Sequence, residues 1–338
     1  MSSNLRIFDV SRRHGVATQQ RQYAILAYRN ELLHCPRMSP DAPAHATALT
    51  HGRRIGPWTC PGCRESRDTA FCGVCGEKRL DHHDLTIAGL AEHAIESLTH
   101  LDGRVFRNLR DLVVRPGTLT AAYINGHRKP YFAPFQIFLI TNLLFFVLQS
   151  ALGFQVLSND LGSHIGTAGR ASQHYSAIAR PIAERRLATT NRTIEGYTHV
   201  FNHAVRVNAK AMVVLMVPAI VLISLASFPR ARFPLITSVV FALHFLAFFL
   251  LLEAFLMPLV GIPAGILLGV LSLGWLWDPL ISAILIALCA VWIYKAYRRV
   301  YGAPPISAAF RSVALSLLFI PIVIGYRFVV FLVTLYTT

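Results

Sequence analysis

The chain has 338 residues, of which 54% are hydrophobic and 14% charged, and its formal net charge is +15. Globular domains carry about 25% charged residues, and the long uncharged runs from Pro134 onward are incompatible with a soluble core. Nucleic acid is disfavoured as a partner despite the positive charge. Many basic residues flank apolar runs, where the positive-inside bias and anionic headgroups place them.

The first 130 residues are polar and basic, and they divide into three segments. Residues 1–55 have weak periodicity and are expected to form a disordered basic arm. Residues 58–79 contain two pairs of cysteines. Residues 85–130 repeat apolar residues at helical spacing, which predicts amphipathic helices that are too short to span a membrane. We expect these helices to lie on the cytoplasmic membrane surface or to pack on the transmembrane bundle.

The cysteine pairs carry the strongest chemical signal in the sequence. Two C-x-x-C turns within sixteen residues are typical of a four-thiolate zinc site, and their ligands are Cys60, Cys63, Cys72 and Cys75. Four thiolates complete a tetrahedral shell and leave no position for water, so the ion is expected to be structural. Two roles stay open for this zinc ribbon: binding a protein partner, or stapling a segment that is too small to fold alone.

Five runs after residue 130 are long and apolar enough to cross a bilayer, which takes about 20 residues. They are 134–157, 211–229, 235–258, 279–297 and 308–335. A sixth segment, 259–277, is rich in glycine and proline and is expected to be re-entrant or interfacial. Residues 158–210 are expected to form an external loop. The predicted fold class is therefore an all-α integral membrane helical bundle with a small N-terminal zinc ribbon.

Basic residues predict the orientation of these spans. Arg128 and Lys129 precede the first span, and a thiolate site requires a reducing compartment, so the N-terminus is expected in the cytoplasm. Five crossings leave the later basic residues inside, whereas six would place them outside; these residues are Lys295, Arg298, Arg299 and Arg311. The sequence therefore predicts a multi-pass membrane protein with five spans and a cytoplasmic N-terminus.

Four polar residues within the spans are candidate intramembrane sites: Asn142, His244, Glu253 and Arg327. Glu253 and Arg327 share a predicted depth and could pair. His244 lies in the middle of the third span and is expected to hydrogen-bond a neighbouring helix, with Asn142 as a candidate partner. We favour structural roles for all of them over transport. No catalytic motif occurs, so no enzyme activity is predicted, and the sequence does not indicate the oligomeric state.

The order of several short motifs resembles the bacterial membrane family known as domain of unknown function 3667. The motifs are Cys60-Pro-x-Cys63, Phe71-Cys-x-x-Cys-Gly76, His100-Leu-Asp102, Arg115-Pro-Gly117, Tyr123, Gly126-x-Arg-Lys-x-Tyr131, Pro134-Phe135, Phe241-Ala-Leu-His-Phe245 and Arg298-Arg-Val-Tyr-Gly302. The resemblance covers about residues 58–335. It implies a protein of the bacterial inner (cytoplasmic) membrane, with a zinc ribbon joined to a multi-pass membrane region, and it supplies no catalytic residues.

These observations favour an adaptor or scaffold in the membrane, with the bilayer around its spans and a protein partner on its zinc ribbon. The alternative is a small transporter or channel component that uses His244, Glu253 and Arg327.

Overall fold

The structure is a computed structural model that describes residues 56–81, 83–86, 104–167, 169, 172–228 and 234–338. It divides the chain into two compact units, Met1–Arg79 and Leu80–Thr338. The predicted arm, residues 1–55, and the first part of the predicted amphipathic helices, residues 87–103, lie outside the described residues.

The first unit is a two-stranded ribbon. β1 (Trp58–Thr59) pairs antiparallel with β2 (Ser66–Arg67), and an isolated bridge joins Phe71 to Lys78. Each pairing closes a tight turn that carries two cysteines. Among the residues described in this unit, 56–79, the buried apolar side chains are those of Cys60 and Cys72, at 0% and 2% exposure. An interior this small cannot stabilise a fold through apolar burial alone.

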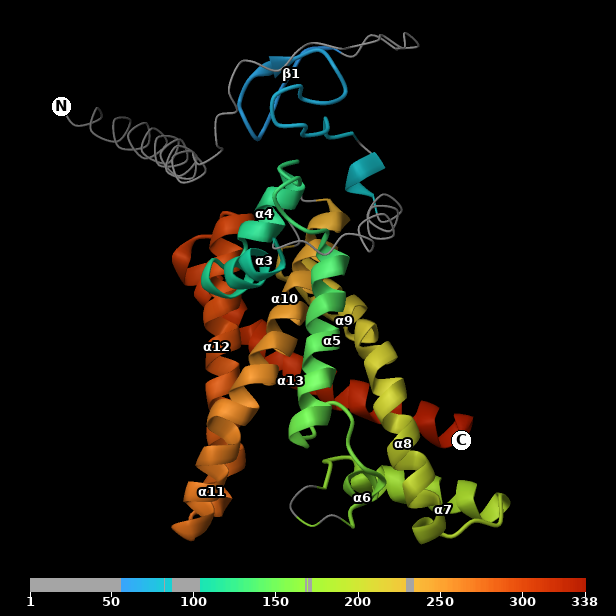
Figure 1. The fold of residues 1–338 in the computed structure, drawn as a ribbon. Coiled ribbons are helices and arrows are strands. Elements are labelled where there is room, and N and C mark those ends of the chain that lie inside the picture. The colour runs from blue at the N-terminus through green and yellow to red at the C-terminus, as the bar shows by residue number, and fades with distance from the viewer. Residues whose placement is uncertain (1–55, 82, 87–103, 168, 170–171, 229–233) are drawn as a thin grey trace, which may run out of the picture. The chain divides into compact units, whose positions relative to one another are not determined.

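The second unit is helical (Figure 1). Its elements in chain order are η1 (His83–Leu85), α3 (Arg104–Val114), α4 (Thr118–Ile124), α5 (Pro134–Leu152), α6 (Leu161–Ile165), α7 (Ser176–Thr189), α8 (Ile194–Met212), η3 (Val213–Leu215), α9 (Met216–Ser227), α10 (Leu235–Leu256), η4 (Met257–Gly261), α11 (Ile262–Val270), η5 (Gly274–Leu276), α12 (Trp277–Val300) and α13 (Pro305–Thr337). Among them η4 is a π-helical turn, and η1, η3 and η5 are 3₁₀ turns.

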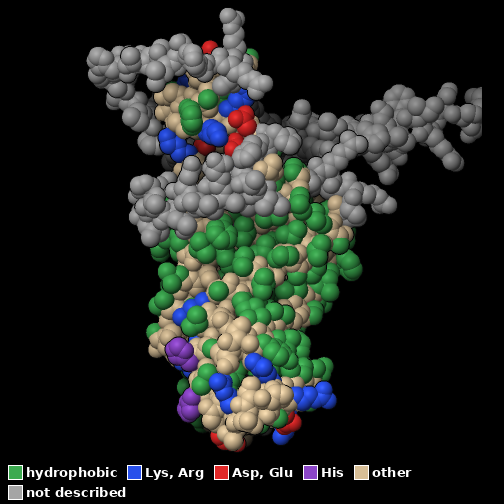
Figure 2. Space-filling model, turned by 90° about the vertical axis from the view of Figure 1, so that its right-hand side faces the viewer, with side chains coloured by type: hydrophobic (Ala, Val, Ile, Leu, Met, Phe, Trp, Pro, Cys, Tyr) green, Lys and Arg blue, Asp and Glu red, His purple; other side chains and the backbone are tan. Residues whose placement is uncertain are grey.

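Five helical stretches of the described chain are long and apolar enough to cross a membrane, which confirms the predicted fold class. They are Pro134–Leu152, Ile194–Ser227, Leu235–Val270, Gly274–Val300 and Pro305–Thr337. Figure 2 shows hydrophobic side chains covering much of one face of this unit, with charged and histidine side chains gathered toward one end. Exposed apolar surface on this scale is what acyl chains require of a spanning bundle.

The helix of the second span extends well beyond its apolar part. α8, η3 and α9 form one helical stretch that begins at Ile194, inside the region 158–210 expected as an external loop. That region also contains α6 and α7. The described part of the predicted loop is therefore mostly helical.

The segment 259–277 continues the third span. The turn η4 carries α10 into α11, and η5 then reverses the chain into α12, where Trp277 Nε1 donates to the Gly261 carbonyl at 2.7 Å. The stretch Leu235–Val270 has 36 residues. At 1.5 Å per residue it is about 54 Å long, compared with about 30 Å for the hydrocarbon core. When α10 spans the bilayer upright, α11 therefore reaches the membrane surface or passes it.

The positions of the basic residues that follow the fourth span agree with five crossings. In Figure 1, α3 and α4 lie at one end, and α6, α7 and α11 lie at the other. Arg299 Nη1 donates to the Pro116 carbonyl and to Thr118 Oγ1, at 3.0 and 2.7 Å, and the Arg311 guanidinium lies 4.5 Å from the Phe228 ring centre. The basic residues after the fourth span thus lie at the α3–α4 end, as five crossings predict.

The predicted helices before the first span pack on the bundle. α4 is buried from Thr118 to Tyr123 and contacts both α10 and α12. Trp292 Nε1 of α12 donates to the Leu112 carbonyl at 2.8 Å, which holds the end of α3. Arg128 Nη2 donates to the Asp84 carbonyl at 3.0 Å, and the Arg128 guanidinium lies over the Tyr123 ring. These contacts make α3 and α4 part of the helical core.

Gly117 allows this close packing. Its φ is +80°, and a Cβ at this position would lie 2.8 Å from the backbone Cα of Ala296. A side chain there would meet both an unfavourable backbone conformation and a rigid neighbour.

We expect Gly117→Ala to destabilise the helical unit strongly, because overpacking costs about 1–3 kcal/mol on top of the backbone strain. Gly153→Ala is the matched control, since Gly153 has φ +72° but no atom within 4 Å of the added Cβ. Thermal unfolding in detergent should show a larger loss for Gly117→Ala. Equal losses would contradict the packing argument.

Candidate metal centre

The two cysteine turns of the ribbon repeat one backbone design. In the first turn the Cys60 amide donates to the Glu65 carbonyl at 2.9 Å, and the Arg64 amide donates to the Cys60 carbonyl at 2.8 Å. In the second turn the Cys72 amide donates to the Glu77 carbonyl at 2.8 Å, and Gly76 to Cys72 at 2.7 Å. The two loops are therefore equivalent, and each presents two sulfurs on the same side.

The fourth residue after the first cysteine of each turn adopts a left-handed conformation. Its φ is 63° at Arg64 and 69° at Gly76. Glycine reaches this conformation without strain, whereas arginine carries a steric cost. The second turn is therefore the less strained of the two.

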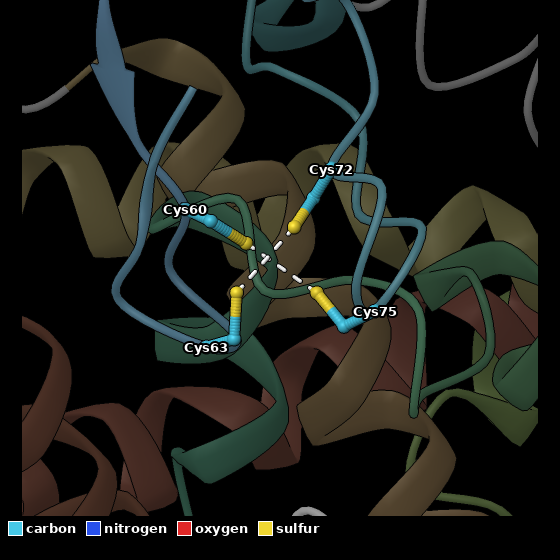
Figure 3. Close-up of side chains that lie close together, drawn as sticks. All are labelled: Cys60, Cys63, Cys72 and Cys75. Atoms are coloured by element: carbon cyan, nitrogen blue, oxygen red, sulfur yellow. Dashed lines mark hydrogen bonds between the residues drawn. The ribbon is translucent and has the colours of Figure 1, made fainter. Parts of the chain in front are cut away.

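The four sulfurs converge on one point (Figure 3). Cys60 Sγ lies 3.4 Å from Cys75 Sγ, Cys63 Sγ lies 3.4 Å from Cys72 Sγ, and all four sulfurs lie within 4.8 Å of one another. A tetrahedral ion with metal–sulfur bonds of about 2.3 Å separates its sulfurs by about 3.8 Å. The donor set and its spacing fit such an ion. Within the residues described, this is the one group of three or more candidate ligands that could hold a metal.

The thiols are placed so that a cation is needed to keep all of them ionised. Burial raises the pKa of the Cys60 thiol to about 12. Burial also acts on Cys72, but the amides of Cys75 and Val74 outweigh it and lower the pKa of that thiol to about 6. A bound divalent ion would hold all four as thiolates.

One residue beside the four sulfurs, Arg67, was not predicted from the sequence. The Arg67 guanidinium interacts electrostatically with the Cys72 and Cys63 sulfurs, and Arg67 Nη2 donates to Glu65 Oε2 at 2.7 Å. A cation beside a four-thiolate centre offsets its net negative charge. The strand pairing of Arg67 with Trp58 produces this contact, and cysteine spacing contains no signal for it.

The polar residues predicted within the membrane do not form one cluster. His244 Nδ1 lies 2.9 Å from Thr120 Oγ1 of α4, while Asn142 Nδ2 donates to the Lys210 carbonyl at 3.0 Å. The expected contact between His244 and Asn142 is therefore wrong, because α4 inserts beside α10 and supplies the partner. Sequence patterns gave no reason to place Thr120 at that depth.

Glu253 and Arg327 are close but not paired. They interact electrostatically, yet no salt bridge joins them among the ion pairs of the described chain. Arg327 Nε donates to the Val156 carbonyl at 2.9 Å, and Arg327 Nη1 to Gln173 Oε1 at 3.2 Å. The shared depth predicted for the two residues agrees with this arrangement, whereas the direct pair is absent.

Comparisons with known proteins support the resemblance found in the sequence. The model of a family described as "Protein of unknown function (DUF3667)" matches residues 102–146, a stretch that includes α3, α4 and much of α5. No curated protein matches the chain, and no solved structure matches it. The matched stretch contains α3, α4 and the turn between them, and its backbone carbonyls at Leu112 and Pro116 accept hydrogen bonds from Trp292 and Arg299 of α12.

The second ribbon turn offers a test of the site. Gly76→Ala should speed loss of the bound metal, because alanine at φ 69° costs roughly 1 kcal/mol in the folded turn. Gly73→Ala, in the same turn, adds a Cβ into open space at an ordinary φ and should behave as wild type. Metal transfer to a colorimetric chelator measures both. Indistinguishable transfer rates would contradict a role for the left-handed conformation of Gly76 in retaining the metal.

Proposed function

We propose that the protein is an adaptor or scaffold of the bacterial inner membrane, with a structural zinc ribbon in the cytoplasm that binds a protein partner. The observation that carries this proposal is the exposure of two apolar side chains on the second cysteine turn. Phe71 is 58% exposed and Val74 is 59% exposed. Neither contributes to the interior of the ribbon.

The position of these side chains makes them suitable as an anchor. Phe71 precedes Cys72 directly, and Val74 lies between Cys72 and Cys75, so a bound ion would immobilise the backbone on which both stand. A rigid apolar pair loses little conformational entropy on binding, and aromatic residues dominate the energetics of protein interfaces. A ribbon that served only as a folding staple would have no need to display them.

Zinc is the proposed ion because four sulfur ligands in a tetrahedral arrangement suit zinc or iron and disfavour the hard cations. A closed shell of four protein ligands supports a structural role. The proposal assigns no reaction to the chain.

The alternative, a small transporter or channel component, would need the intramembrane polar groups to act together. His244 and Glu253 are nine residues apart on α10, which places them about 13.5 Å apart along the axis and on opposite faces. A single path past both side chains therefore has less support than separate roles.

Replacing Phe71 and Val74 by serine should abolish recovery of the partner in affinity purification of the full-length protein from membranes. Zinc content and membrane insertion should stay at wild-type levels, because neither side chain is a ligand. Asp68→Asn, an exposed change on the same ribbon, is the matched control. Recovery of the same partner by the double variant would refute the docking role, and a chain without one equivalent of zinc would refute the site.

The proposed orientation is tested separately. A reporter that is active only in the cytoplasm should work when fused to the N-terminus and fail when fused after Thr338. Five crossings require the two ends on opposite sides of the membrane. Activity at both ends would exclude the five-span topology.

A further inference from the structure

The end of the helical unit opposite α3 and α4 is closed by what we term the α6–α7 cap, residues 154–189. Arg327 of α13 attaches the cap to the spans through Val156 and Gln173. Gln149 at the end of α5 is a second attachment, since Gln149 Nε2 donates to Ser158 Oγ at 2.6 Å and Gln149 Oε1 accepts from the Val156 amide at 3.3 Å. Asn202 of α8 is a third, since its Oδ1 accepts from the Leu161 amide at 2.9 Å. The side-chain hydrogen bonds of Arg327 described above are therefore both made to the cap.

Glu253 lies beside this attachment without a partner of its own. Glu253 is only 2% exposed, and its Oε2 atom makes no hydrogen bond. The charged and titratable groups that act on it are Arg327 of α13 and Cys289 of α12. α5 and α9, which also pack on α10, contain no ionisable side chain. The ionisable groups of α3 and α4 lie at the opposite end of the unit.

If the Glu253 carboxylate were ionised, two arrangements of its surroundings would be possible. It can remain unpaired, which costs several kcal/mol in a low-dielectric interior, or it can draw the Arg327 guanidinium away from the cap. A protonated carboxyl has neither effect, because it is neutral. The arrangement observed, with Arg327 held by Val156 and Gln173, is the one that a neutral Glu253 permits.

We propose that Glu253 is a proton-binding site inside the helical unit, and that its proton decides whether Arg327 holds the α6–α7 cap. The carboxylate takes one proton from water and becomes a neutral acid, and no other bond is made or broken. When the proton leaves, Arg327 turns to Glu253 and the cap loosens. The π-helical turn η4 begins four residues after Glu253, and such turns are frequent at functional sites. This role is independent of what the zinc ribbon binds.

Two buried titratable groups of the cap, His164 and Tyr175, do not produce such a response near neutral pH. His164 stacks on Phe331, and its Nδ1 lies 2.8 Å from the Tyr175 hydroxyl. Burial lowers the pKa of His164 to about 4, and burial raises the pKa of Tyr175. Both groups therefore stay neutral while a buried carboxyl titrates.

The test is hydrogen exchange of cap amides in the full-length protein in lipid nanodiscs, from about pH 5.5 to about pH 9, a range in which buried carboxyls titrate. Protection factors, corrected for the intrinsic rate, should fall roughly tenfold in wild type as pH rises. They should stay high at every pH in Glu253→Gln, which mimics the protonated acid. Glu184→Gln, which removes an exposed carboxylate of the cap paired with Arg180, should titrate like wild type.

Either of two results would overturn the proposal: a flat profile in wild type, or the same fall in Glu253→Gln. Should the glutamine variant fail to fold, infrared spectra of wild type decide the matter. A protonated-carboxyl band must then disappear over the same pH range in which cap protection falls. A band that is absent at low pH, or that does not change, would refute proton binding at Glu253.

Discussion

Lipid offers no hydrogen-bond partners, and this constraint organises the helical unit. Polar side chains of the spans are directed at backbone carbonyls of segments that do not span, as Trp292 is to Leu112, Arg299 to Pro116 and Arg327 to Val156. Each such bond satisfies a polar donor of a spanning helix and also anchors a loop or short helix. The segments between the spans are therefore held by the same groups that would otherwise be costly inside a membrane.

The ribbon depends on a different interaction. With two short strands and two buried cysteine side chains, it has too little apolar interior to fold without a cross-link. A metal ion bound by all four sulfurs would supply that cross-link and leave Phe71 and Val74 on the surface. The proposed adaptor role follows from this division, because the ion would stabilise the fold while the apolar side chains remained available for recognition.

The proposed proton site follows from the same lack of hydrogen-bond partners inside the membrane. Arg327 is satisfied by the α6–α7 cap, and this leaves Glu253 alone in the interior. A bundle that only required stability would pair the two charges or replace them with apolar residues. Retaining both, with one of them unpaired, is the arrangement expected of a group that exchanges a proton.

The sequence by itself determined the five apolar helices and the four-cysteine group. Hydrophobic length reports membrane crossing directly, and the C-x-x-C spacing of Cys60 and Cys63, repeated at Cys72 and Cys75, reports a shared ion. Only the tertiary structure decided the polar partners. Thr120 rather than Asn142 faces His244, and Arg327 binds the cap rather than Glu253, because these contacts join segments far apart in the chain. Helical periodicity says which face a residue occupies, but not which neighbour that face meets.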